Sequence, residues 1–486
     1  MHKVDILRIS GIVFSRQSYS KYVYSRTIHK NQSTKQKNLR PIKAIRNYSS
    51  NIRKRSALFL SDANPTEDSI VKVDINLKEI LSSPSQIKEN LAARKIDLNI
   101  SELLDDCEKM KIIAKKKLDI EQERRDITIR VGALSKVKLN DDLRRSKEIL
   151  IQRGKEVKQL SKQIQKQSWD VEERVILQSL QIPNKLHLNT PKENKVLRSS
   201  GKIEDCPAST SHIQIGKEKQ LIKFSNIGPK AYYLKDELAD LERKLIISAK
   251  NYLKHAKLSP FTTPDIFRSV VMEGSGVNVA DERQVLTLQS DEDNINLQLL
   301  DDFHIVGTSI YSFVGYLTKV KVRPSSLPLK YFSIGRHYCP GESLPGLYGV
   351  LQTTNAAIFG GCLSENSAHE LLDEYTDLIW SYLSLLNIPI RMVRLGAPNI
   401  SPAESLKYVF EIWSPSLQQF IQVSTLSMFG DFISRRLMCF QDNKETKYIH
   451  MMGGDMLNIT RLLALILEYN LLDDRKLSSV LEIQHG

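Results

Sequence analysis

The sequence predicts an α+β protein with a long N-terminal antiparallel coiled-coil hairpin, followed by an antiparallel-sheet domain flanked by helices. Three observations predict this fold class. Apolar residues recur every seven positions between 143 and 171, which is the spacing of a two-helix seam. Beyond residue 217, helical segments alternate with β-rich runs. The 486 residues leave room for two or three domains.

Residues 1–60 carry almost all of the excess positive charge. The whole chain has a net charge of +14, yet this segment holds 14 Lys and Arg and a single acid, Asp5. A leader rich in Arg, Lys and Ser and poor in acids is typical of a mitochondrial transit peptide. A disordered basic tail is the alternative. The transit-peptide interpretation predicts a protein of the mitochondrial matrix.

The remaining composition gives no indication of a membrane span or a metal. No run approaches the roughly 20 apolar residues of a membrane helix, so we expect no membrane partner. The five cysteines are scattered without a CxxC pair. Metal ligation by thiolates needs clustered ligands, so we expect reduced cysteines, no metal and no cofactor.

An arm-like helical domain is predicted at 68–189. Residues 71–97 indicate a small helical cap around Ser83-Pro84, and the hairpin follows with a turn near 138–140. We expect the outgoing helix to be lined by Leu103, Cys107, Met110, Ala114 and Leu118. We expect the returning helix to be lined by Leu143, Leu150, Val157, Ile164 and Val171. Pro183 ends this helix because proline cannot continue the backbone ladder.

The hairpin is basic within an otherwise neutral remainder of the chain. Residues 109–166 contain 18 Lys and Arg against eight acids. Such an excess on exposed helices favours phosphate contacts, which carry no sequence information; a merely solvated arm is the alternative. The candidate nucleic-acid-binding residues are Lys115, Lys116, Arg124, Arg125, Arg130, Arg144, Arg145, Lys155, Lys158 and Lys162.

A polar connector at 190–216 is predicted to be a linker between the arm and a second domain at 217–486. In that domain, the runs at 319–323 and 347–352 are β-rich, and a helix around Arg461 closes the pattern. The alternation suits a mixed domain with an antiparallel sheet.

Six segments, in order, resemble seryl-tRNA synthetases, which are class II aminoacyl-tRNA synthetases. They are SSPSQIKENLAARKIDLNISELLD (82–105), IPN (182–184), LPLKY (327–331), EIWSPSLQQFIQVS (411–424), DFISRR (431–436) and HMMGGDMLNITRLLALILE (450–468). The resemblance implies a class II synthetase-like sheet domain, a tRNA-binding hairpin and a dimer formed through motif 1, whose counterpart is 237–264. Leu238, Leu241, Leu245 and Ile246 favour a partner-facing helix there, although a core-facing helix has the same pattern.

The resemblance also implies that the chemistry has been lost. Serine activation needs cations at the α-phosphate, carboxylates for Mg²⁺ and a carboxylate at the serine ammonium group. Where the family has these groups, this chain has other residues, and the loop after motif 2 is shorter. The degenerate positions are Ile310 (a Glu), Cys339 (an Arg), Gly341 (a Glu), Gly349 (an Arg), Gln422 (a Glu) and Met428 (an Asn). We therefore expect no serine activation.

Several polar family positions persist, namely Glu411, Asp431, Arg435, Arg436 and Arg461. Arg461 and Arg436 are candidates for a residual anion site. The structural alternative is that these residues form ion pairs that hold the sheet together, which we favour for Asp431 and Arg435.

In leader, fold and lost motifs, the chain resembles the seryl-tRNA synthetase-like mitochondrial proteins of insects, a catalytically inactive branch of the family. That resemblance implies a non-catalytic subunit that forms a heterodimer with the active mitochondrial seryl-tRNA synthetase and assists tRNA-Ser binding. The alternative is an independent adaptor acting on mitochondrial DNA, another mitochondrial nucleic acid or a matrix protease. A ligase using another amino acid is a third hypothesis, and Ile310 and Cys339 argue against it.

Overall fold

The computed structural model describes residues 56–59, 71, 73–136, 141–206, 208–225, 227, 230–288, 302–442 and 447–472. Apart from 56–59, the leader predicted at 1–60 lies outside these residues, as does the hairpin turn predicted near 138–140. Across the described ranges, no helix is both long and apolar enough to cross a bilayer. In the same ranges, His, Cys, Asp and Glu form no group of three or more suited to a metal ion.

Two short helices precede the hairpin. The first, α1 (Leu77–Ser82), begins at Asn76, whose side chain accepts a hydrogen bond from the Glu79 N–H. The second, α2 (Pro84–Arg94), follows directly because proline suits the first position of a helix and cannot extend the preceding one. These helices form the cap predicted at 71–97.

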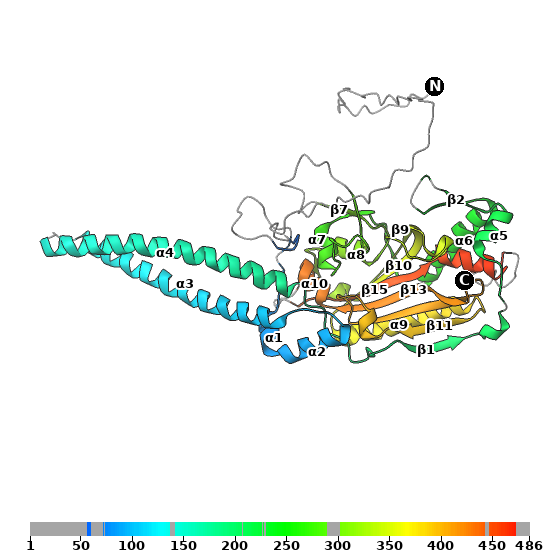
Figure 1. Cartoon of the computed structure of the whole chain (residues 1–486), viewed down its shortest axis with the longest axis horizontal. Coiled ribbons are helices and arrows are strands. Elements are labelled where there is room, and N and C mark those ends of the chain that lie inside the picture. Colours follow the sequence, from blue (N-terminus) through cyan, green and yellow to red (C-terminus); the bar gives the residue numbers. More distant parts are fainter. Residues whose placement is uncertain are drawn as a thin grey trace, which may run out of the picture. The chain divides into compact units, whose positions relative to one another are not determined.

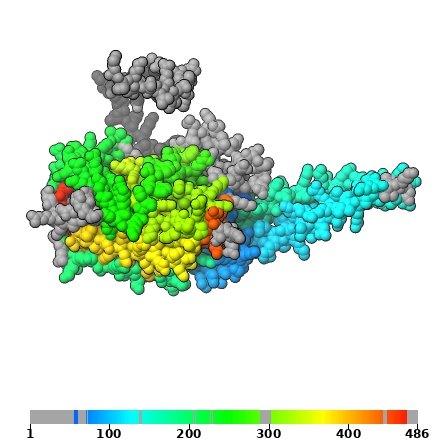
Figure 2. Space-filling model, turned by 180° about the vertical axis from the view of Figure 1, so that it is seen from behind, coloured from blue at the N-terminus to red at the C-terminus, as the bar shows by residue number. Residues whose placement is uncertain are grey.

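The hairpin consists of α3 (Ile100–Leu134) and α4 (Asp141–Ser179), which lie side by side in both views (Figures 1 and 2). The seam predicted for α4 is confirmed at Val157, Ile164 and Val171, which are buried at a spacing of seven, whereas Leu143 and Leu150 are half-buried. The helix ends four residues before Pro183, as the sequence indicates.

The seam predicted for α3 is correct only in its first half. Leu103 and Cys107 are buried, but Ala114 is exposed and Leu118 is 60% exposed. In a regular seam, the apolar residues follow one another at alternating intervals of three and four positions. After Cys107, two intervals of three follow in succession, to Met110 and then to Ile113. Such a local overwinding moves the apolar stripe around the helix. Beyond it, the seam is formed by Ile113, Ile120 and Ile127.

An eight-stranded sheet forms the second domain, in the strand order β1-β11-β12-β13-β15-β10-β9-β4. Its strands are β1 (Lys195–Ser200), β4 (Ser259–Pro260), β9 (Leu329–Tyr338), β10 (Gln352–Cys362), β11 (Ile390–Arg394), β12 (Leu406–Ser414), β13 (Gln419–Gly430) and β15 (His450–Asn458). Every neighbouring pair is antiparallel except β4 and β9. The predicted fold class is confirmed.

Helices cover both faces of this sheet. On β10, Ala356 and Ile358 belong to one core cluster, whereas Ala357 and Phe359 belong to another. Because successive strand residues point to opposite faces, the two cores lie on opposite sides of the sheet. Figure 1 shows α8 on one side of the sheet and α9 on the other. The first core includes α6 (Asp236–His255), α9 (Glu365–Ser384) and α11 (Ile459–Glu468). The second includes α7 (Ser269–Gly274), α8 (Ile310–Leu317) and α10 (Phe432–Leu437).

Three smaller sheets accompany the large one. They are β2 (Ile222–Ser225) with β3 (Ala231–Leu234), β5 (Ile266–Arg268) with β7 (Phe303–Ile305) and β6 (Leu286–Leu288), and β8 (Lys321–Val322) with β14 (Phe440–Gln441). The β-rich run predicted at 319–323 contains β8. The run predicted at 347–352 was wrong, because Pro345 and Gly346 begin the 3₁₀ helix η4 (Gly346–Tyr348) and β10 starts only at Gln352.

The segment predicted as a linker, 190–216, is part of the sheet domain. β1 pairs with β11 as an edge strand of the large sheet, and α5 (His212–Glu218) begins at a buried histidine. Most residues of β1 are exposed. An edge strand with solvent on both faces shows no alternation of apolar and polar residues. The polar composition of β1 therefore resembles that of a connector.

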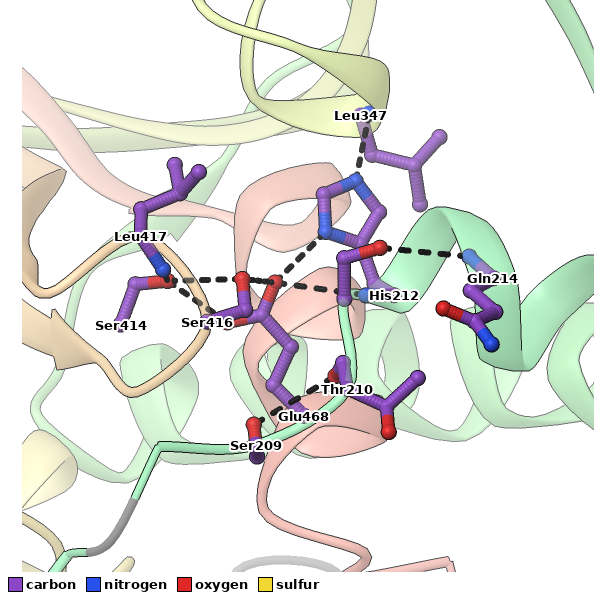
Figure 3. Close-up of polar contacts among 10 residues, drawn as sticks. Ser209, Thr210, His212, Gln214, Leu347, Ser414, Ser416, Leu417 and Glu468 are labelled. Atoms are coloured by element: carbon purple, nitrogen blue, oxygen red, sulfur yellow. Dashed lines mark hydrogen bonds and ion pairs between the residues drawn. The ribbon is translucent and has the colours of Figure 1, made fainter.

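The start of α5 is fixed by a buried polar network (Figure 3). His212 Nδ1 lies 2.8 Å from Glu468 Oε1, and the Leu347 N–H donates to His212 Nε2 at 3.0 Å. Since Nε2 accepts that bond, Nδ1 carries the proton and donates to the carboxylate. The hydroxyls of Ser414 and Ser416 donate to the same carboxylate. The network joins α5, η4 and α11 to the end of β12.

The apolar stripe of α6 faces the core. Leu238, Leu241 and Leu245 are buried in the cluster that contains α11, so the core-facing alternative applies to these residues. The strand that follows, β4, ends at Pro260 rather than at 264.

Hydrogen bonds fasten the base of the hairpin to the sheet domain. Arg94 donates to Ser401 O at 2.9 Å and to Glu404 O at 2.6 Å, and burial lowers the pKa of its guanidinium to about 10. The Asn184 amide donates to Ala403 O at 2.8 Å. The loop at 401–405 and the hairpin exit therefore form one hydrogen-bonded unit.

Candidate functional site

The positions predicted to be degenerate lie at the start of α8, at the end of β9 and in the loop after it, and on β13. Ile310, the first residue of α8, is buried, and its Cδ1 would lie 2.7 Å from a Cβ placed on Gly453 of β15. The side chain therefore packs closely on the sheet. Isoleucine offers hydrocarbon where the resemblance predicts a carboxylate, and hydrocarbon cannot hold an ammonium group.

Cys339 directly follows β9 and is half-buried. Burial raises the pKa of the Cys339 thiol. The neighbouring His337 and the Gly341 N–H together lower this pKa by more than burial raises it, so the pKa lies below its ordinary value. Within the described residues, the buried His337 Nδ1 has no hydrogen-bond partner. A thiolate or thiol cannot provide the bidentate fork of an arginine.

The loop between β9 and β10, residues 339–351, is tightly folded. Lys230 Nζ donates to Glu342 O at 2.5 Å and to Gly349 O at 2.9 Å. A Cβ on Gly349 would lie 2.1 Å from Leu344 O, and Gly341 has a φ of +75°. Both degenerate positions therefore need glycine for the shape of this loop.

Arg461 lies in the first turn of α11, where the Asn458 side chain caps its N–H at 2.9 Å. The guanidinium makes three bonds: Nε to Tyr348 O at 3.1 Å, Nη1 to Gln422 O at 2.8 Å and Nη2 to Glu342 Oε1 at 2.5 Å. The chain thus supplies its own anion to the arginine. An external anion must displace the Glu342 carboxylate, so the residual anion site stays a prediction.

Arg436, the second candidate for that site, shares no partner with Arg461. Its Nη2 donates to Leu180 O at 3.0 Å and to Ile182 O at 3.4 Å, and its guanidinium lies 3.7 Å from the centre of the Phe432 ring. Burial lowers the pKa of the guanidinium to about 9. These contacts bind Arg436 to the exit of the hairpin.

The remaining positions lie along β13 and just beyond it. Gln422 meets Arg461 through its backbone carbonyl. Met428 is buried in the core, at a position where the resemblance predicts an amide. Arg435 Nε donates to Asp431 Oδ2 at 2.6 Å, which is the structural ion pair favoured from the sequence.

Two carboxylates near Tyr311, the half-buried Asp455 and the buried Glu404, were missed by the sequence interpretation. Asp455 on β15 accepts a bond from Asn355 at 3.0 Å, and burial raises its pKa. Burial also raises the pKa of Glu404, but Lys407, 3.0 Å away, and hydrogen bonds lower it below its ordinary value. One signal was visible: Asp455 is a lone acid inside the otherwise uncharged strand MMGGDML.

All ten candidate nucleic-acid-binding residues are exposed on the hairpin. Five belong to α3 and five to α4, and they are Lys115, Lys116, Arg124, Arg125, Arg130, Arg144, Arg145, Lys155, Lys158 and Lys162. Their exposure is what phosphate contact requires.

One face of α4 carries a stripe of cations. Residues separated by three or four positions share a helix face, and this spacing links Arg144, Lys147, Ile151, Lys155, Lys158 and Lys162. We call this set the α4 stripe. In the described part of the chain, no acidic side chain lies within 4.0 Å of Lys155, Lys158 or Lys162. By contrast, Arg153 on another face is paired with Glu123 at 2.8 Å and with Glu156 at 3.3 Å.

Comparison with known proteins agrees with this geometry. Residues 298–470 match the family described as "tRNA synthetase class II core domain (G, H, P, S and T)". The chain is 28% identical over 434 residues to "Serine--tRNA synthetase-like protein Slimp" of Drosophila melanogaster, covering 87% of this chain and 90% of that protein. It is 25% identical over 422 residues to the mitochondrial serine–tRNA ligase of Mus musculus, covering 82% and 79%.

A solved structure has the same fold. The seryl-tRNA synthetase of Pyrococcus horikoshii, crystallised with ATP, superimposes with a TM-score of 0.69 at 20% identity, covering 81% of this chain and 94% of that one. Residues 298–470 therefore match a class II tRNA synthetase core domain, and the predicted resemblance to seryl-tRNA synthetases is confirmed.

Proposed function

We propose that the protein is a non-catalytic mitochondrial subunit that pairs with the active mitochondrial seryl-tRNA synthetase, stabilises it and assists tRNA-Ser binding. The observation that carries the non-catalytic role is the engagement of Arg461 by Glu342 at 2.5 Å and by two backbone carbonyls. The residue that would bind a phosphate already has an internal carboxylate.

The substitutions around Arg461 support the same conclusion. Ile310 and Cys339 stand where the family binds the amino acid and the α-phosphate. Losing one such group costs roughly two or more powers of ten in rate. Because the losses affect separate subsites, a change of substrate does not account for them.

The α4 stripe supports a role in RNA binding. Four of its five cations are exposed beside the hairpin seam, and the lysines for which the described residues offer no acidic partner are available to phosphates. A hairpin bonded to the sheet domain through Arg94 and Asn184 would hold a bound RNA in a fixed relation to the partner subunit.

An apolar surface favours a protein partner. The outer face of the β5-β7-β6 sheet exposes Ile266 by 48%, Phe303 by 43% and Leu288 by 40%. A mainly apolar groove of about 520 Å³ adjoins it, lined in part by Phe261 and Tyr316. Contiguous exposed apolar surface of this kind often marks an interface. The composition of the leader and the similarity to a mitochondrial serine–tRNA ligase favour the mitochondrial matrix.

The test is size-exclusion chromatography with light scattering, using the mature chain alone and mixed with the mitochondrial seryl-tRNA synthetase at micromolar concentration. We expect a one-to-one complex that charges tRNA-Ser better than the synthetase alone. We also expect the isolated chain to show no serine-dependent ATP–pyrophosphate exchange. Separate peaks would refute the pairing, and exchange above background would refute the loss of catalysis.

The second candidate is an adaptor that binds another mitochondrial nucleic acid or a matrix protease. The α4 stripe favours it equally, because lysine–phosphate contacts do not distinguish polyanions. Competition at fixed salt between tRNA-Ser, unrelated RNA of equal length and duplex DNA separates the two candidates. Preference for tRNA-Ser supports the subunit, and equal binding supports the adaptor.

A further inference from the structure

A second cavity, of about 620 Å³, lies beside the end of β9. It is lined by the β2–β3 hairpin, α6, Leu286 of β6 and the ends of β9 and β10. Arg336 and Tyr338 line it, and they alternate along the strand with His337 and Cys339. Because alternate residues point to opposite faces, this cavity faces away from the degenerate site. Its volume is within the roughly 300–1,000 Å³ of small-molecule sites.

Three tyrosines form much of its wall. Tyr232 and Tyr338 are half-buried, and Tyr233 is 54% exposed. The Tyr232 hydroxyl lies 3.3 Å from the Thr460 hydroxyl, which holds the ring in place. Fixed aromatic rings beside a solvent-accessible cavity provide stacking surfaces for a nucleobase.

The charges of the lining are mainly positive. Arg336 Nη1 donates to Glu242 Oε1 at 3.1 Å and to the Thr354 hydroxyl at 2.6 Å, so the one acid of the lining is already neutralised. Arg243 adds a cation whose side chain is 76% exposed, with a long 3.4 Å contact to Asp240. Lys230 adds another. The cavity therefore attracts an anion.

We propose that this cavity binds a nucleotide, with the base against the tyrosines and the phosphate toward Arg243 and Arg336. An inorganic anion would make no use of the aromatic wall, and an apolar ligand would make no use of the excess positive charge. Aromatic rings interleaved with cations are the combination by which proteins bind single nucleotides and unpaired strands. The nucleotide comes either from a free mononucleotide or from the end of a single-stranded RNA. The inference does not depend on the proposed function.

The test uses the full chain and two probes, AMP and a single-stranded hexanucleotide RNA, with affinities measured by calorimetry. Tyr338→Leu removes a stacking ring, and we expect it to weaken binding about tenfold. Arg243→Gln removes an exposed cation and should weaken binding severalfold. Lys244→Gln is the matched control, because it makes the same charge change next along α6 at an exposed residue outside the cavity lining.

The outcomes separate the sources. If AMP binds and responds to both cavity variants, the ligand is a mononucleotide; if only the RNA does so, the ligand is a strand end. Binding at Arg461 instead would respond to Glu342→Gln and not to Arg243→Gln. The proposal is overturned if neither probe binds at millimolar concentration, or if Arg243→Gln and Lys244→Gln behave alike. Arg243 is at the surface, so this comparison holds even if Tyr338→Leu lowers Tm.

Discussion

Glu342→Gln tests whether the chain's own carboxylate blocks Arg461. The substitution keeps the size of the side chain and a hydrogen-bond acceptor but removes the negative charge that lies 2.5 Å from Arg461 Nη2. The two carbonyl contacts of the guanidinium, to Tyr348 and Gln422, stay in place. A free oxyanion then competes with a neutral amide instead of a carboxylate.

The expected magnitude follows from the exposure of the two side chains. Arg461 is 10% exposed, but Glu342 is 54% exposed, so solvent screens the pair considerably. Exposed ion pairs contribute about 0.2–1 kcal/mol, and this half-buried pair should lie slightly above that range, at about 1–2 kcal/mol. Because about 1.4 kcal/mol corresponds to tenfold in affinity, Glu342→Gln should strengthen pyrophosphate binding by roughly 5- to 30-fold.

The assay is calorimetric titration with pyrophosphate, accompanied by urea unfolding. Glu374→Gln is the matched control, since Glu374 is also about half exposed and pairs with a lysine, Lys330, at 2.7 Å. We expect stronger pyrophosphate binding only in the Glu342 variant. Equal pyrophosphate affinity in the wild type and in Glu342→Gln would refute the idea that the carboxylate occupies the site.

Three further predictions concern the hairpin, the buried network and the thiols. Replacing Lys155, Lys158 and Lys162 by Gln in one variant should reduce the slope of log K for RNA binding against log salt by about 2–3. Arg153→Gln should change this slope less, because Arg153 is already paired. Filter binding at several salt concentrations measures the slopes, and equal slopes in the two variants would contradict the prediction. Burial raises the pKa of Glu468, but bonds from His212, Ser414 and Ser416 lower it below its ordinary value, so its stabilising contribution is present above pH 4.5 and lost as pH falls further. Glu468→Gln should lower the free energy of unfolding by about 2–4 kcal/mol at pH 7, and it should make the loss of stability below pH 4.5 less steep. Urea unfolding at several pH values measures both effects, and an unchanged pH profile would count against the network. At pH 8, iodoacetamide should modify Cys339 before Cys362 and Cys439. Burial raises the pKa of the Cys362 and Cys439 thiols to about 11 and about 12, whereas the pKa of Cys339 is lowered. Peptide mass spectrometry gives the order of modification, and earlier modification of Cys439 would contradict the prediction.

The α4 seam and the α3 seam show where periodicity suffices. The spacing of seven in α4 specifies one buried face, and Val157, Ile164 and Val171 occupy it. In α3, two apolar registers are available after Cys107, and only packing against α4 selects Ile113 over Ala114. The same holds for β1, whose exposed residues follow no apolar pattern and whose strand character comes from pairing with β11.

The candidate site divides in the same way. Residue identities alone singled out Ile310 and Cys339 as predicted degenerate positions, because hydrocarbon and a thiol cannot perform the chemistry that the resemblance implies there. The fate of the surviving arginines required the fold: Arg436 binds carbonyls at the hairpin exit, and Arg461 binds Glu342 from a loop more than 100 residues earlier.

The sequence by itself therefore determined the helical arm with its basic surface and the resemblance to a class II core, since these follow from composition, local periodicity and motif order. Only the tertiary structure decided that the polar connector is an edge strand, that the apolar side of α6 faces the core and that a carboxylate covers Arg461. Each of these depends on which distant segments meet, and contacts between distant segments leave no periodic pattern along a single chain.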